Sequence, residues 1–143
     1  MNEENEKRIK EHFPFMRNIP FSPTLGVRDG WFNTVWHMCE KIETTLKSSP
    51  PGTAFEVLQL KEKFGLMRCY ISTTNPKLNS IIDDAEHESE RTCEVCGEPG
   101  KLRPNLSWIQ TLCDKHYDEA SGGKDENTTP LKRDIGWVSL RPA

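Results

Sequence analysis

The chain has 143 residues, of which 34% are hydrophobic and 29% charged, so it can form one domain with a modest core or a smaller core with an appended finger. Its formal charge of -3 disfavours a dedicated nucleic-acid-binding protein, because such proteins neutralise phosphates with an excess of basic residues. The sequence contains neither a long apolar run for a membrane span nor an apolar secretory signal, so we expect a cytoplasmic protein with reduced thiols.

Residues 1–28 are predicted to form an N-terminal extended segment that begins with a short charged helix over residues 3–12. The stretch FPFMRNIPFSPTLG contains three prolines, which interrupt regular structure and favour an extended backbone. We expect this segment to lay three aromatic side chains over the core: Phe13, Phe15 and Phe21.

Residues 29–90 are predicted to form the core, with a helix, a β-hairpin and a second helix in that order. DGWFNTVWHMCEKIETTLK predicts the first helix, with Asp29 as its N-cap. Its apolar residues recur at steps of three and four along one face: Phe32, Trp36, Cys39, Ile42 and Leu46. FEVLQLKEKFGLMRCYIS predicts two strands joined near Gly65, with the following apolar faces: Leu58 and Leu60 in the first, and Met67, Cys69 and Ile71 in the second.

The second helix of the core is predicted within TTNPKLNSIIDDAEHESER. Asn75 can accept hydrogen bonds as its N-cap, and Pro76 suits the first helical position, where a missing N–H has no consequence. Its apolar stripe has four members: Leu78, Ile81, Ile82 and Ala85. The acidic run over residues 83–90 is expected to form a solvated helix face, with a cation site as the alternative. These elements predict an α+β fold.

The stretch CEVCGEPGKLRPNLSWIQTLCDKH carries two ligand pairs at metal spacing. Three thiolates and one imidazole suit a tetrahedral Zn²⁺, and we expect one structural ion on Cys93, Cys96, Cys113 and His116. A tight turn at the first pair, a small hairpin and a helix that carries the second pair would be similar to the treble-clef arrangement over residues 91–120. Ordinary buried thiols are the alternative. Because four protein ligands leave no position for a reactive water, we expect no enzyme activity.

Other chemistry-bearing side chains are interpreted as structural or exposed. Cys39 and Cys69 fall on apolar faces, which predicts buried core thiols. Arg68 is expected to pack on a sheet face beside Tyr70. Three histidines in polar surroundings are interpreted as surface residues: His12, His37 and His87. The sequence has no phosphate-binding glycine loop and no nucleophile–base pair outside the four ligands.

Residues 121–143 are predicted to be a linker and C-terminal tail. SGGKDENTTP has linker composition, and LKRDIGWVSLRPA contains one short apolar stretch around Trp137 and Leu140.

Four stretches together resemble a family of small, uncharacterised bacterial and phage proteins: DGWFNTVWHMCEKIE, LQLKEKFGLMRCYI, AEHESERTCEVCGEPGKLR and SWIQTLCDKH. The resemblance covers about residues 29–118 and supports the four metal ligands. It also marks a set of matching residues: Gly30, Trp31, Lys61, Phe64, Gly65, Arg68 and Tyr70. The chain departs from the family at Leu66 and Cys69, where a second Gly and a Phe would stand, and this puts the tight hairpin turn in question. The family implies a small phage or prophage accessory protein that acts on a host component.

These observations favour a non-enzymatic zinc-binding module that binds a host or bacterial protein and inhibits or adapts it. If the chain is phage-encoded, we expect it to act in the host cytoplasm. Trp108 and Trp137 offer aromatic anchors for such a contact, and the acidic helix could mimic nucleic acid. One alternative is nucleic-acid binding through Lys101, Arg103 and Lys115, which four basic against five acidic residues over 91–120 disfavour. Cleavage is disfavoured further because KLRPNLSWIQTL lacks a histidine. The other alternative is a structural subunit of a larger assembly, and the oligomeric state is open.

Overall fold

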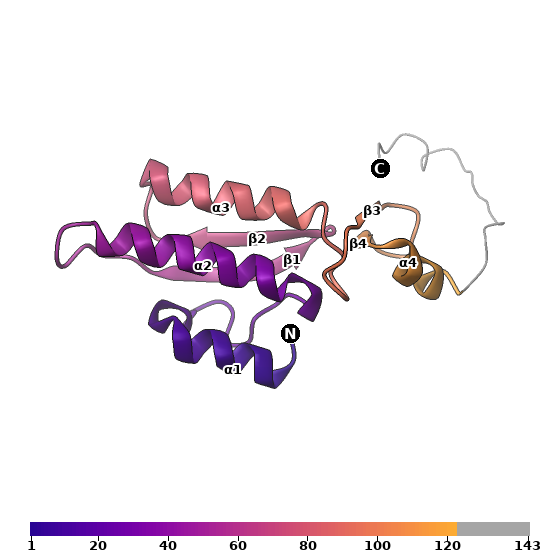
Figure 1. Ribbon diagram of the computed structural model, residues 1–143, viewed down its shortest axis with the longest axis horizontal. Helices are drawn as coiled ribbons and strands as arrows, with labels where there is room; N and C mark the ends of the chain where they lie inside the picture. Colours follow the sequence, from indigo (N-terminus) through magenta and orange to yellow (C-terminus); the bar gives the residue numbers. More distant parts are fainter. Residues whose placement is uncertain (123–143) are drawn as a thin grey trace.

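The computed structural model describes residues 1–122, which form a mixed α+β fold (Figure 1). The elements in chain order are α1 (Glu3–His12), α2 (Phe32–Lys47), β1 (Val57–Lys63), β2 (Leu66–Ile71), α3 (Pro76–Ser89), β3 (Lys101–Arg103), β4 (Gln110–Leu112) and α4 (Asp114–Ala120). The predicted fold class is therefore confirmed, with helix, hairpin and helix followed by a second hairpin and the fourth helix. The predicted tail, with Trp137 and Leu140, lies outside the described residues apart from its first two positions. None of the helices in residues 1–122 is both long and apolar enough to cross a bilayer.

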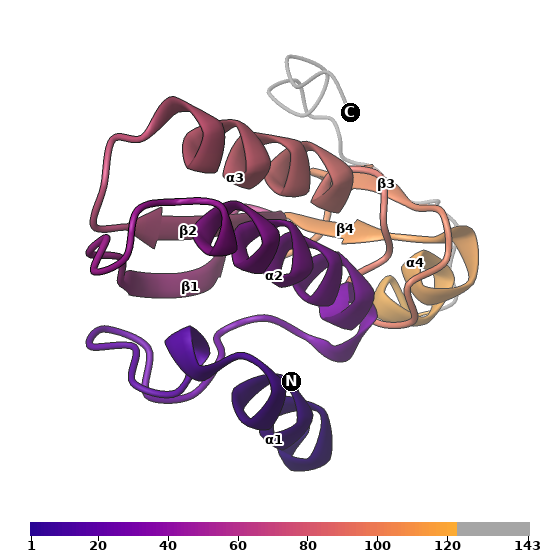
Figure 2. The ribbon, with the colours of Figure 1, turned by 60° about the vertical axis from the view of Figure 1, so that its left-hand side comes forward.

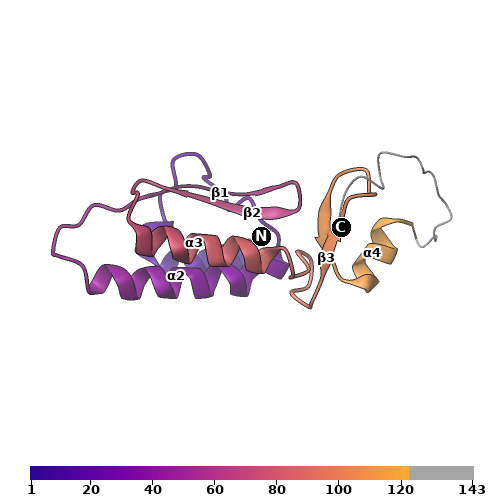
Figure 3. The same cartoon turned by 90° about the horizontal axis from the view of Figure 1, so that it is seen from above.

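Helices α2 and α3 lie side by side against one face of the antiparallel hairpin β1–β2, as Figure 3 shows from above. The enclosed core includes Trp31, Val35, Ile42, Leu60 and Met67, all fully buried. Helix α1 packs below α2, and β3, β4 and α4 gather at one end of the core (Figures 1 and 2). We call residues 91–120 the finger and the elements before it the core.

The start of α2 differs from the prediction. Asp29 does not cap this helix, because a 3-10 turn over Asp29–Trp31 comes first and places Trp31 at the N-cap position. The Asp29 carboxylate instead accepts hydrogen bonds from the backbone N–H of Asn2 at 2.7 Å and from the Asn5 side chain at 3.3 Å. Asp29 therefore holds α1 against the start of α2.

The hairpin turn is tight. Lys63 pairs with Leu66, and the two residues between them, Phe64 and Gly65, both have positive φ angles, 54° and 83°. Two positive φ angles are typical of a two-residue type I′ turn, which needs a glycine here but none at position 66. Leu66 at this position therefore does not loosen the turn.

The first strand buries different residues from those predicted. A register shift between Val57 and Gln59 interrupts the alternation of sides, so that Val57 and Leu60 are buried. The prediction that Leu58 shares the buried face was wrong, because Leu58 is only half-buried.

The N-terminal segment follows the prediction in part. Helix α1 is present, and Phe13 is fully buried while Phe15 packs against the core. Phe21, however, is 68% exposed, which contradicts the expected packing. The segment is also not extended throughout, because Pro14–Met16 form a 3-10 turn. Farther along, Gly26 pairs with the edge of β1 by donating to the Leu60 carbonyl oxygen at 3.2 Å.

Helix α3 begins as predicted, with the Asn75 side chain accepting from the backbone N–H groups of Lys77 and Leu78. Its acidic face was predicted to be solvated throughout, and this was wrong for two residues. Glu86 accepts hydrogen bonds from the Cys69 backbone N–H at 3.1 Å and from Arg68 at 3.0 Å, while Glu88 accepts from the Thr34 hydroxyl. The free carboxylates of this face are fewer: Asp83, Asp84 and Glu90 are exposed.

Candidate metal centre

The first ligand pair lies in a tight turn directly after α3. Gly97, with φ of 84°, lets the chain reverse so that its N–H donates to the Cys93 carbonyl oxygen at 2.9 Å. The second pair lies where β4 meets α4: Cys113 is the N-cap of that helix, and His116 is in its first turn. The Cys113 sulfur accepts from the His116 backbone N–H at 3.5 Å, which orients it at the helix start.

The structure brings all four predicted side chains together. Their ligand atoms, three Sγ and one imidazole nitrogen, lie within 4.8 Å of one another. The Sγ atoms of Cys96 and Cys113 are 3.8 Å apart, and His116 Nδ1 lies 3.6 Å from Cys93 Sγ and 3.2 Å from Cys113 Sγ. These four residues could therefore hold one metal ion.

The spacing fits a tetrahedral ion. With metal–sulfur bonds of about 2.3 Å and a metal–nitrogen bond of about 2.0 Å, tetrahedral angles separate two sulfurs by about 3.8 Å, and a sulfur from the nitrogen by about 3.5 Å. The three separations given above match these values within a few tenths of an ångström, and all four ligand atoms lie within 4.8 Å of one another. Nδ1 faces the sulfurs and would bind the ion, while Nε2 points away from them and lies 4.0 Å from the Glu119 carboxylate.

The environment of Cys93 favours its ionised form. Burial raises the pKa of this thiol, but hydrogen bonds from the backbone N–H groups of Cys113, Cys96 and Val95 outweigh burial and lower the pKa from 9.0 to about 7. A thiolate is the form that binds a metal. The backbone around Cys93 is therefore arranged to stabilise a negatively charged ligand.

The other two cysteines are not part of the centre. Cys39 and Cys69 are buried in the core, as predicted. Burial raises the pKa of Cys69 to about 12 and also raises the pKa of Cys39. Both thiols therefore stay neutral and shielded at neutral pH.

Alkylation is expected to separate these two classes of cysteine. After a chelator removes the metal from the native protein, we expect iodoacetamide to label Cys93, Cys96 and Cys113, and to label Cys39 and Cys69 only after unfolding by guanidinium. Intact mass and peptide mapping count the adducts. Rapid labelling of either core thiol in the native protein would contradict this assignment.

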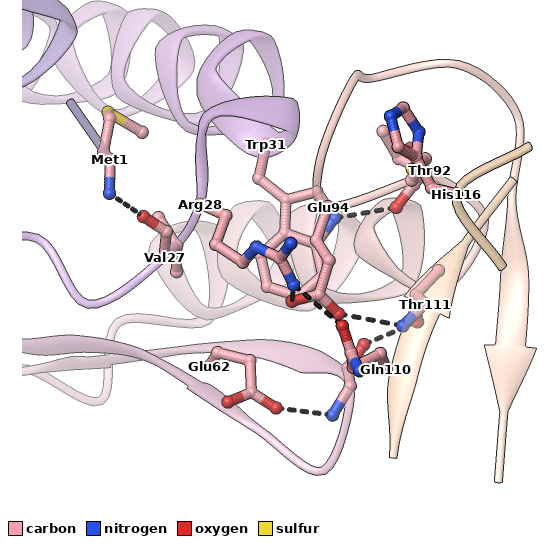
Figure 4. Close-up of polar contacts among 12 residues, drawn as sticks. Met1, Val27, Arg28, Trp31, Glu62, Thr92, Glu94, Gln110, Thr111 and His116 are labelled. Carbon is pink, nitrogen blue, oxygen red and sulfur yellow. Dashed lines mark hydrogen bonds and ion pairs between the residues drawn. The ribbon is translucent and has the colours of Figure 1, made fainter. Parts of the chain in front are cut away.

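Sequence reasoning missed the junction between the finger and the core. Gly30 donates its backbone N–H to the Glu94 carbonyl oxygen at 2.8 Å, and the Trp31 indole N–H donates to Thr92 at 2.8 Å (Figure 4). A Cβ on Gly30 would overlap the Cys93 carbonyl oxygen and lie 2.6 Å from that of Glu94. The finger therefore sits directly on the backbone at the start of α2, where only glycine fits.

Glu94 is the central side chain of this junction and is 1% exposed. Its carboxylate accepts from the Thr111 backbone N–H at 2.9 Å and lies 3.5 Å from the Arg28 guanidinium (Figure 4). Burial raises the pKa of Glu94, while the Thr111 N–H and Arg28 oppose that increase. No sequence signal identified this residue, because its partners come from distant parts of the chain.

The tip of the core hairpin completes the junction. The Thr111 hydroxyl donates to the Gly65 carbonyl oxygen at 2.6 Å, and the Gly65 N–H donates to Glu62 at 2.8 Å (Figure 4). Arg28 donates to the Gln110 side-chain oxygen at 2.8 Å. Strand β4 is thus held to the hairpin tip through Thr111 and to Arg28 through Gln110.

The remaining predicted candidates stay apart from the cluster. The His12 ring packs against Phe13 and Trp36, while His37 and His87 are exposed on helices. Among the basic residues of the finger, Lys101 and Lys115 are exposed.

Arg103 is engaged inside the finger and is not available to a phosphate group. It donates to the Leu112 carbonyl oxygen at 3.1 Å and to Asp114 at 2.8 Å, and its guanidinium lies over the Tyr117 ring. The hydrogen bond and the charge of Arg103 hold the pKa of Asp114 below its ordinary value. One of the three residues predicted for nucleic-acid contact is therefore structural.

Comparison with known proteins finds no matching family model, no matching curated protein and no matching solved structure.

Proposed function

We propose that the protein is a non-enzymatic, zinc-binding module that acts by binding another protein. The observation that carries this proposal is the Cys93, Cys96, Cys113 and His116 cluster, whose separations fit one tetrahedral ion. Three sulfurs and one nitrogen favour Zn²⁺ among the common divalent ions of a reduced compartment. Four protein ligands occupy every tetrahedral position, so the ion would stabilise the finger and would not activate water.

The order of elements around the cluster supports a treble-clef-like finger. The tight turn at Cys93–Gly97 supplies one pair, hairpin β3–β4 follows, and the start of α4 supplies the other. Hydrogen bonds from Gly30 and Trp31 tie this unit to the core. The ion would thus position the surface shared by the finger and the core.

Exposed aromatic side chains support a protein partner. Phe64 is 68% exposed at the tip of the core hairpin, and Trp108 is 62% exposed in the finger. Large aromatic residues are enriched at the centres of protein interfaces, where they lose more surface to water than smaller residues do. The resemblance to phage proteins favours a host protein as the partner.

Mimicry of nucleic acid by the acidic end of α3 is part of this proposal, with fewer carboxylates than the sequence predicted. It would use three exposed carboxylates, those of Asp83 and Asp84 in α3 and of Glu90 at its C-cap, because Glu86 and Glu88 are engaged within the core. A variant with Asp83→Asn, Asp84→Asn and Glu90→Gln is expected to keep its fold and to bind a basic partner about tenfold more weakly at low salt.

Glu86→Gln is expected to cost about 1 to 2 kcal/mol of unfolding free energy, because two donors lose a charged acceptor.

The proposal is tested by cross-linking capture with the tagged, zinc-loaded protein in a lysate of its source cells, followed by mass spectrometry. We expect one predominant partner. Its capture by the triple variant is then compared over a salt series with its capture by a matched control on α1, which carries Glu3→Gln, Glu4→Gln and Glu11→Gln. An unchanged salt dependence in the triple variant would eliminate mimicry. Failure of the natural protein to capture any partner would contradict the interaction function.

A further inference from the structure

A groove of about 670 Å³ lies where the finger meets the N-terminal part of the core. One side comes from residues 25–28, which run along β1, and the other from the β3–β4 loop with Trp108. Its volume is within the range of ligand-binding pockets. The groove is separate from the metal cluster, since none of the four ligands lines it.

Gln110 gives this groove an unused hydrogen-bond donor. The residue is 6% exposed and lines the groove, and its side-chain oxygen accepts from Arg28 Nη1 at 2.8 Å. A guanidinium has donors only, so the oxygen of the Gln110 amide must be the atom that faces Arg28. The amide NH₂ then has no partner within residues 1–122, although buried amide groups are normally hydrogen-bonded.

Arg28 supplies the charge of the same site. Its Nη1 contacts Gln110 and Glu94, while its Nε and Nη2 have no partner among residues 1–122, and its side chain is 48% exposed (Figure 4). A guanidinium fork matches the two oxygens of a carboxylate. Because Glu62 and Glu94 also line the groove, a singly charged carboxylate fits the local charge better than a doubly charged phosphate.

Apolar side chains surround these donors. Leu25 and Val27 lie on the core side, Leu106 and Trp108 on the finger side, and the Trp108 ring is 62% exposed. An apolar side chain that packed on Trp108 would cover this ring beside the charged site.

We propose that the groove binds a segment of a partner protein in which an acidic side chain is next to a large apolar one. The carboxylate pairs with Arg28 and accepts from the Gln110 amide, and the apolar neighbour packs on Trp108. This inference rests on the proposed interaction function, and it names the surface and the chemistry of the partner.

Binding is tested with two peptide libraries on the immobilised, zinc-loaded full chain. Both are acetylated and amidated hexapeptides, one with Glu-Leu at the central positions and the other with Gln-Leu. We expect about tenfold greater retention of the Glu library, the ratio that one charge-assisted hydrogen bond gives. Equal retention of the two libraries would overturn the proposal.

Three variants locate the site. Arg28→Gln is expected to abolish the preference for Glu, whereas Lys41→Gln, which removes the same charge from the exposed face of α2, is expected to keep it. Since Arg28 also contacts buried Glu94, Trp108→Ala serves as the second variant: this exposed side chain can be removed without disturbing the core. We expect about tenfold lower retention for Trp108→Ala, and unchanged retention would overturn the proposal.

The capture experiment distinguishes this inference from the proposed function. Reduced capture of the partner by Trp108→Ala supports the groove. Equal capture by Trp108→Ala and the natural protein leaves the interaction function standing and overturns the groove. Capture of no partner, together with a clear preference for the Glu library, supports the groove as a carboxylate site and contradicts the wider function.

Discussion

Chelation of the metal is expected to unfold the finger and to leave most of the core folded. The finger has few apolar residues to hold it, since its fully shielded apolar side chains are those of Cys93 and Leu112. Structural zinc contributes about 10 to 16 kcal/mol of apparent binding free energy in small fingers, far more than this burial provides. The core keeps its own cluster, which extends from Ile9 to Ala85.

Two-dimensional NMR of the natural protein, before and after addition of a chelator, measures this effect. We expect signals from residues 91–120 to collapse toward unfolded positions and those of α2 and β2 to persist. Cys113→Ala should give the same spectrum without a chelator. Cys69→Ala is the matched control, because it removes a cysteine from the core and leaves the cluster intact. A chelated protein with an unchanged finger spectrum would contradict the structural role of the ion.

Gly30→Ala is expected to have the second largest effect, because the new Cβ would overlap the backbone of Cys93 and Glu94. Backbone atoms cannot move aside as a side chain can, so the finger must shift away from α2. Overpacking of this kind costs about 3 kcal/mol of unfolding free energy. The shift also separates the Gly30 N–H from the Glu94 carbonyl oxygen.

Urea unfolding of the zinc-loaded proteins measures the free energy of unfolding, and competition with a chelating dye measures metal affinity. We expect the free energy of unfolding and the metal affinity to fall for Gly30→Ala. The control is Gly52→Ala: a Cβ there meets nothing within 4 Å, and only its positive φ costs free energy, about 1 kcal/mol. If Gly30→Ala and Gly52→Ala lose the same free energy of unfolding, close packing of the finger on Gly30 does not stabilise the junction.

Features set by neighbouring residues could be predicted from the sequence. Helix α3 follows from its Asn75 cap, Pro76 and apolar spacing, and the four cluster residues all lie within one stretch of 24 residues, 93–116. Local spacing is enough in these cases because the helix cap, the helical period and the two ligand pairs are each formed by residues nearby in the chain.

Features that depend on distant contacts could not be predicted in this way. Arg28 and Glu94 are 66 residues apart, and no periodicity marks a carboxylate that a remote guanidinium and backbone will bury. The register shift in β1 exchanged Leu58 for Val57 on the buried face, and Glu86 is engaged only because β2 lies beside α3. Asp29 was also missed as a distant contact: a 3-10 turn separates it from α2, and its oxygens accept from Asn2 and Asn5 at the start of α1.

X-ray absorption at the zinc edge, combined with native mass spectrometry, tests the central claim most directly. We predict one zinc per chain, with three sulfur neighbours at about 2.3 Å and one nitrogen neighbour at about 2.0 Å. A bound oxygen from water in place of one of these neighbours, or a natively folded finger that contains no metal, would contradict the account.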